Sequence, residues 1–219
     1  ALDGKYTKAG LFALKQAYDG YKFYLMQISE CDKMIDKVIN HIGKSGNGQD
    51  TVGKRKAIRH HKPDVDKLGP NMLNLFKGRD ATIISGITDY TWMQLLSEIG
   101  YDLSRWPTEK HFTSWLGLAP GQNNSGKRNR NSKKKGMPKA GQIFRTIAQG
   151  LINSKKIAIG AFGRRLRGRK GPGIAIKAMA RKIAVLYWRV MVKGVDFAEQ
   201  GIEKYEQIIR ENKLKTLNK

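Results

Sequence analysis

A run of apolar residues at helical spacing is the feature that most constrains the fold of this chain. Between residues 11 and 42 the apolar side chains recur every three or four positions, with Asp32 interrupting the series. The series is Leu14, Tyr18, Tyr21, Leu25, Ile28, Ile35, Ile39 and Ile42. This spacing predicts a long amphipathic helix with coiled-coil character. Two arrangements stay open: the helix pairs with a helix of another chain, or it packs on its own domain.

The rest of the chain has the pattern of a linker followed by shorter helices. Residues 43–79 are rich in Gly, Lys and polar residues, which is typical of a linker or mobile loop. Residues 80–100 combine an apolar turn, Gly86 and an amphipathic segment that Thr88 can cap, which predicts a helix–hairpin–helix. Further helices are expected over about 108–120, 138–159, 176–193 and 197–214, and no alternating pattern typical of strands is found.

These patterns predict a mainly α chain: a long coiled-coil-like helix followed by a helical domain that contains the helix–hairpin–helix. We expect residues 1–46 to form the coiled-coil-like region, 47–79 a basic linker, and 80–219 the helical DNA-binding domain. No apolar run approaches the roughly 18 residues that cross a membrane, and no signal-peptide pattern is present, so no membrane is expected as a partner. The single cysteine, Cys31, fits a reducing cytoplasm.

The net charge of the chain indicates which kind of partner it binds. The sequence has 42 Lys and Arg against 18 Asp and Glu, a net charge of +24. Between Arg105 and Lys193 there are 22 basic residues and one acid, Glu109, so this stretch alone carries 22 − 1 = +21. A merely solvated surface mixes the two signs. Nucleic acid is therefore favoured as the partner over an anionic membrane or an acidic protein.

Two basic segments flank the predicted helix 138–159 and are the candidate phosphate contacts. The first lies in a glycine- and asparagine-rich loop over 121–137 and contains Lys127, Arg128, Arg130, Lys133, Lys134 and Lys135. The second, predicted as a loop over 160–173, contains Arg164, Arg165, Arg167, Arg169 and Lys170. We expect these side chains to bind DNA, together with Gly86 and Thr88, because backbone N–H groups in such a hairpin can hold a phosphate.

The residues offer a nucleophile but no convincing metal site. Ser125 and Ser132 both lie in the first basic loop, and composition alone does not choose between them. Basic side chains near a serine can stabilise a pentavalent phosphoryl transition state. The acids of residues 80–102 fit roles at helix surfaces and caps, and the histidine–aspartate group over 60–66 lies in a basic linker. We therefore expect no metal and no cofactor within this chain.

Three blocks of sequence resemble a known family. They are GITDYTWMQLLSEIGYDLSRWPTEKHFTSWLGLAPGQNNSGK over residues 86–127, GAFGRRL from Gly160, and AMARKIA from Ala178 with Lys193-Gly194 after it. In this order they are similar to the transposase domain of the insertion-sequence one-hundred-and-ten family, the DEDD transposases described as RNA-guided recombinases. Thr88 departs from the family pattern, which has a second hairpin glycine at that position.

The resemblance implies a DNA transposase or recombinase of the bacterial cytoplasm, associated with the nucleoid. It implies that Ser125, in the Ser-Gly pair after the Leu-Ala-Pro turn, is the catalytic nucleophile and forms a transient phosphoserine link to DNA. It places the four acidic residues of the family and their Mg²⁺ in an N-terminal RuvC-like domain. We accordingly expect this chain, which begins at Ala1, to be the C-terminal part of the enzyme. The partners implied are DNA, a guide RNA and further copies of the chain, joined through residues 11–42.

One alternative from a different class stays open at this point. A basic chain of this composition also suits a nucleic-acid-binding module with no catalytic activity. The Ser125-Gly126 pair favours the recombinase.

Overall fold

A computed structural model of the chain is mainly α-helical, which confirms the predicted fold class. It describes residues 7–43, 62–120 and 138–194, with Gly4, Gly136, a few positions between 207 and 214, and the backbone of 124–125 and 128–129. The elements are α1 (Lys8–Gly43), α2 (Leu68–Leu75), a 3-10 helix η1 (Ala81–Ile83), α3 (Asp89–Ile99), α4 (Glu109–Trp115), β1 (Asn124–Ser125), β2 (Arg128–Asn129), α5 (Lys139–Leu151), α6 (Ala158–Lys170) and α7 (Pro172–Lys193). Most of the helix predicted over 197–214 lies outside the described residues.

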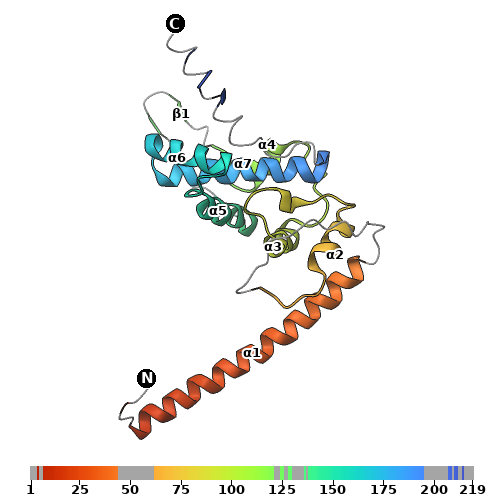
Figure 1. The fold of residues 1–219 in the computed structure, drawn as a ribbon, viewed down its shortest axis with the longest axis vertical. Helices are drawn as coiled ribbons and strands as arrows, with labels where there is room; N and C mark the ends of the chain where they lie inside the picture. The colour runs from red at the N-terminus through yellow and green to blue at the C-terminus, as the bar shows by residue number, and fades with distance from the viewer. Residues whose placement is uncertain are drawn as a thin grey trace.

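The long amphipathic helix predicted over residues 11–42 is confirmed as α1. Its C-terminal end packs against α2, and the rest extends from the helical body as a rod (Figure 1). Asp32, which interrupts the apolar series, accepts a hydrogen bond from the backbone N–H of Asp64 (3.1 Å). Asp36, four residues later on the same face, accepts one from the N–H of Asp66 (3.0 Å). The acidic position that interrupts the apolar series therefore helps to hold residues 64–66 against α1.

Helix α2 is a correction to the linker predicted over 47–79. Met72 and Leu73 are buried, and the ring of Phe76 stacks on Trp92 of α3 with centroids 5.2 Å apart. The side-chain amide of Asn71 also donates to Asn40 Oδ1 of α1 (2.7 Å). The helix was missed because Gly69 and Pro70 indicate a turn in isolation, whereas its apolar residues are buried only once α1 and α3 lie beside it. Residues 44–61 of the predicted linker lie outside the described part of the chain.

Helix α7 lies at the centre of the body and packs against α4, α5 and α6. Its buried residues recur at helical spacing, as predicted. The helix is followed by Gly194, which has a φ of 101°, a backbone conformation that glycine adopts more readily than other residues. Tyr187 joins the aromatic core, with its ring 5.6 Å from Phe144 and 6.3 Å from Phe112. Complete burial raises the pKa of the Tyr187 hydroxyl far above its ordinary value. Helices α4, α5 and α6 are thus fixed to one shared core.

Candidate nucleic-acid interface

Ser125 lies in a β-hairpin that the sequence did not indicate. Strands β1 and β2 pair antiparallel, with Asn124 opposite Asn129 and Ser125 opposite Arg128. Each strand has only two residues, too few for an alternating pattern to show in the sequence. In such a pair the Cα atoms of opposite residues lie about 4.5–5.5 Å apart. The backbone of an arginine therefore lies directly across from that of the candidate nucleophile.

The other cations of the first basic segment cannot be placed relative to this hairpin. Lys127, Arg130 and Lys133–Lys135 lie outside the described residues, as does the alternative nucleophile Ser132. Of the six DNA contacts predicted in this segment, only the backbone of Arg128 is described. Their roles therefore stay predictions, and so does the role of Ser125.

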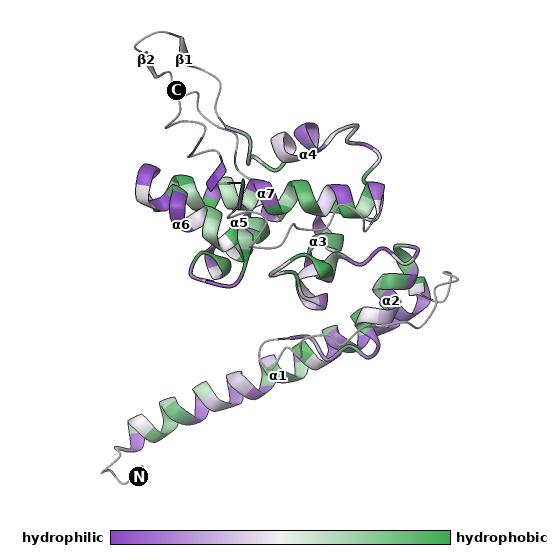
Figure 2. Cartoon of the chain, turned by 45° about the horizontal axis from the view of Figure 1, so that its top comes forward, coloured by the Kyte–Doolittle hydropathy of each residue, from purple (hydrophilic) through white to green (hydrophobic). Residues whose placement is uncertain are grey.

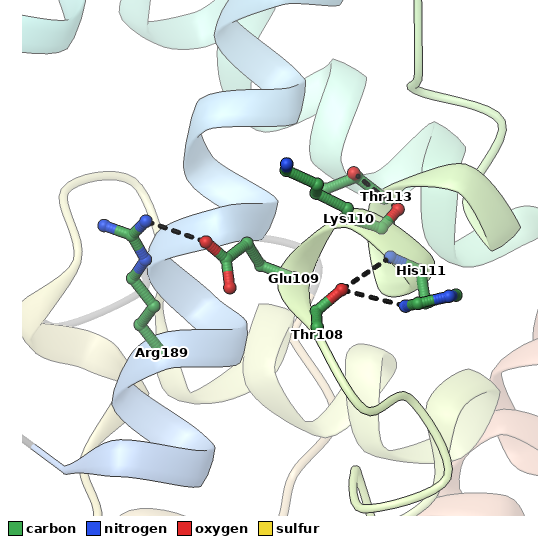
Figure 3. A network of polar contacts seen from close by, with 6 residues as sticks. All are labelled: Thr108, Glu109, Lys110, His111, Thr113 and Arg189. Carbon is green, nitrogen blue, oxygen red and sulfur yellow. Dashed lines mark hydrogen bonds and ion pairs between the residues drawn. The ribbon is translucent and has the colours of Figure 1, made fainter.

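Helix α4, which precedes the β-hairpin, is held at its N-terminus by two contacts. Thr108 caps it by accepting a hydrogen bond from the backbone N–H of His111 (3.4 Å). Figure 3 shows the Glu109 carboxylate pointing from α4 to Arg189 of α7, whose guanidinium donates to it at 2.8 Å. This hydrogen bond lowers the pKa of the Glu109 carboxyl below its ordinary value. The one acid of the basic stretch thus holds α4 against α7.

On the far side of the hairpin, α5 begins at Lys139, and Pro138 is the residue that directly precedes it. Leu118, ahead of the hairpin, is buried, and so is Ala140 behind it. Both α4 and α5 pack on α7. The segment that contains Ser125 is therefore anchored in the core at its two ends.

The second basic segment is a helix, which corrects the loop predicted over 160–173. The loop was inferred from its glycines, but Gly160 and Gly163 serve close packing. A Cβ on Gly163 would meet Met179 Sδ of α7 at 2.0 Å, and one on Gly160 would meet the carbonyl oxygen of Ser154 at 2.4 Å. The helix ends at Gly171, where φ is 86°.

The helical conformation divides the predicted DNA contacts of this segment into two groups. Arg164 turns inward, and its guanidinium donates to the carbonyl oxygens of Ser154 and Ile152, which follow α5. These carbonyls have no partner within α5, so Arg164 acts as a C-terminal cap. The others are exposed on α6: Arg165, Arg167, Arg169 and Lys170. Four of the five predicted cations of α6 thus face solvent, and the fifth has a structural role.

Where the sequence predicted a helix–hairpin–helix, the structure has a single 3-10 turn, η1, ahead of α3, so the motif stays a prediction. Gly86 has φ of 90°, and a Cβ there would meet Ile147 Cγ2 of α5 at 2.7 Å. Thr88 caps α3, since its hydroxyl accepts a hydrogen bond from the N–H of Thr91 (3.2 Å). Both residues therefore have roles in folding, and their predicted contact with DNA stays a prediction.

Two features of this surface were missed from the sequence. Arg145, Lys155 and Lys156 are exposed on and just after α5, between the two predicted basic segments. A groove of about 790 Å³, lined by both polar and apolar side chains, also separates α3 from α5. No short sequence motif indicates the exposed cations or the groove, because both depend on which face of α5 the other helices leave uncovered. Among the described residues no group of three or more His, Cys, Asp or Glu side chains is placed to hold a metal ion.

The fold and this surface define a strongly basic, mainly helical domain built around one central helix. Residues 81–162, from η1 through the hairpin into α6, match the family described as Transposase IS116/IS110/IS902 family. This match confirms, over that segment, the resemblance to the transposase domain found in the sequence. Comparisons with curated proteins and with solved structures give no significant match. In the described part of the chain no helix combines the length and apolar character needed to span a bilayer.

Proposed function

We propose that this transposase domain binds DNA through its basic surface and supplies Ser125 as the nucleophile for strand cleavage and exchange. The observation that carries the proposal is the position of the Ser125 backbone. It lies opposite Arg128 in a short hairpin whose flanking helices, α4 and α5, are both packed on α7. A loop held at both ends keeps a reacting atom in place better than a free one, which favours reaction of a bound phosphate.

In the proposed reaction the Ser125 oxygen attacks the phosphorus of a DNA phosphodiester. A serine–phosphate bond forms as the bond from phosphorus to one deoxyribose oxygen breaks, and that oxygen leaves with a proton. The phosphoserine preserves the bond energy, so the hydroxyl of a second strand can attack it and release the serine. Lys and Arg side chains of the basic segments stabilise the charge on the phosphoryl oxygens. The described residues do not fit a Mg²⁺ site, so none of these steps is assigned to a metal held by them.

Self-association through α1 is a second part of the proposal. Leu14, Tyr18, Tyr21 and Leu25 are all more than two-fifths exposed although they form one apolar stripe. Figure 2 shows apolar and polar stretches alternating along the helix as it leaves the body. An apolar stripe of this length on a projecting helix is typical of a coiled-coil seam. We propose a second copy of the chain as the partner that covers it.

Replacement of the nucleophile tests the proposed reaction. Ser125→Ala in the complete gene product should abolish strand exchange while DNA affinity stays within about twofold, because phosphate contacts dominate such interfaces. Ser132→Ala is the matched control in the same basic segment and should recombine normally. A suicide substrate should trap a covalent adduct with the parent protein and with the Ser132→Ala variant only. Strand exchange by Ser125→Ala, or an adduct that maps to Ser132, would reject the assignment and favour the non-catalytic binding module.

A further inference from the structure

We infer that the groove between α3 and α5 holds unpaired nucleic-acid bases and gives this domain a base preference. The groove has a volume of about 790 Å³, within the ordinary range for ligand pockets. The polar side chains of Thr91 and Gln94 line it from α3, and those of Gln142 and Thr146 line it from α5. Ile143, Ile147 and Leu151 contribute apolar atoms to the lining. The inference rests on the proposed DNA binding and specifies which part of the nucleic acid this groove contacts.

The lining is chemically unlike the surface around it. Among the described residues that line it, Glu98 and Lys139 alone are charged, and their side chains lie 3.9 Å apart and offset each other. The α5 side of the groove nevertheless belongs to the stretch from residue 105 to 193, which has a net charge of +21. A neutral groove in such a surface is poorly suited to a phosphate. It suits the uncharged part of a nucleotide, which is the base.

The free amide groups fit the edge of a base. Within the described residues, neither the Gln94 nor the Gln142 side-chain amide has a hydrogen-bond partner, so both can bind a ligand. A side-chain amide presents one donor and one acceptor side by side, which matches the paired donor and acceptor on a base edge. The apolar lining can contact the face of the ring, as in other sites for unpaired bases.

The concave shape favours an unpaired base over a duplex. In a duplex the base edges lie at the floor of the DNA grooves, so a protein must extend a helix or strand to reach them. Here the recognising side chains line a hollow, and the base must enter it. Arg145, three residues after Gln142 on α5, and Lys155, beyond the end of α5, are exposed cations that can bind neighbouring phosphates.

The test measures affinity for three fluorescein-labelled 20-nucleotide strands, dA20, dC20 and dT20, by fluorescence anisotropy at fixed salt. We expect the parent protein to prefer one strand by roughly 5- to 150-fold, the range typical of amide contacts to a base edge. Gln142→Ala should reduce this preference to within about twofold, whereas binding to the weakest strand should change little. Gln149→Ala is the matched control, because Gln149 is exposed on the same helix outside the groove and should keep the preference.

A second variant fills the groove and does not depend on removing a contact. A Cβ at Gly150 meets nothing within 4 Å, so Gly150→Leu should place an apolar side chain in the groove without displacing the backbone. Leucine also favours the helix over glycine, so folding should be retained. This variant should lose the base preference as well, while its affinity keeps the salt dependence of the parent protein.

The possible outcomes separate the two proposals. Loss of preference in both groove variants but not in Gln149→Ala supports the inference. Equal affinity of the parent protein for all three strands would overturn it while leaving DNA binding intact. So would a preference that survives Gly150→Leu, or tighter binding to a dA20·dT20 duplex than to any single strand. Absence of binding to every probe would overturn the proposed function as well.

Discussion

The packing of α6 on the end of α5 predicts opposite effects for two Gly→Ala substitutions in the same helix. Gly160 lies against the carbonyl oxygens of Ser154 and Leu151, which an added Cβ would meet at 2.4 and 2.9 Å. Gly168, two turns further along, would place a Cβ in open space. Both substitutions reduce the entropy of the unfolded chain and raise helix propensity. Only the first forces backbone atoms apart.

The magnitudes follow from these distances. Ordinary contact begins at about 3.4 Å, so Gly160→Ala must displace α6 from Ser154 by 3.4 − 2.4 = 1.0 Å. Such overpacking costs about 1–3 kcal/mol, against a propensity gain of at most about 1 kcal/mol. We therefore expect Gly160→Ala to lower the free energy of unfolding by about 1–2 kcal/mol. Gly168→Ala should raise it by up to about 1 kcal/mol.

Thermal unfolding followed by circular dichroism at 222 nm measures both effects. For a chain of this size about 1 kcal/mol shifts Tm by roughly 2–4 °C. Gly160→Ala should therefore melt roughly 2–8 °C lower than the parent protein, and Gly168→Ala up to roughly 4 °C higher. If both variants melted higher, α6 would not be seated on the end of α5. The reasoning that divides its arginines into an inward cap and an exposed group would then be refuted.

Three further predictions concern the charge and the surfaces. Arg165→Gln with Arg169→Gln should weaken DNA binding equally for all sequences and reduce the slope of log affinity against log salt by about 2, as measured by titration at several salt concentrations. Leu25→Asp should lower the mass measured by light scattering, whereas Gln16→Asp on the opposite face of α1 should not; unchanged masses would reject α1 as the seam. Because its arginine partner on α7 lowers the pKa of Glu109 in the folded state, stability should fall as the pH drops through that lowered pKa, and Glu109→Gln should flatten this part of the profile in acid unfolding.

Patterns within short stretches of the sequence were sufficient to predict α1 and the starts of α3 and α5. The apolar spacing over 11–42 predicted α1, Thr88 predicted the start of α3, and Pro138 the start of α5. These predictions succeeded because periodicity and capping act within a few residues of the chain. The block around the Leu-Ala-Pro turn likewise identified the family that the match over 81–162 confirms. The domain boundaries and the roles of the site residues stay predictions.

Only the tertiary structure decided the features that depend on a neighbouring element. Glycine is typical both of mobile loops and of close helix contacts, so Gly160 and Gly163 indicated a loop until α5 and α7 lay against α6. An arginine in a basic segment has two possible partners, and Arg164 was assigned to DNA until the carbonyls after α5 lay within its reach. The sequence by itself therefore determines the charge and the helices that local spacing and capping indicate, such as α1 and α3. Packing determines which glycines allow contact, which cations face solvent and where a groove remains, because these depend on distances between segments far apart in the chain.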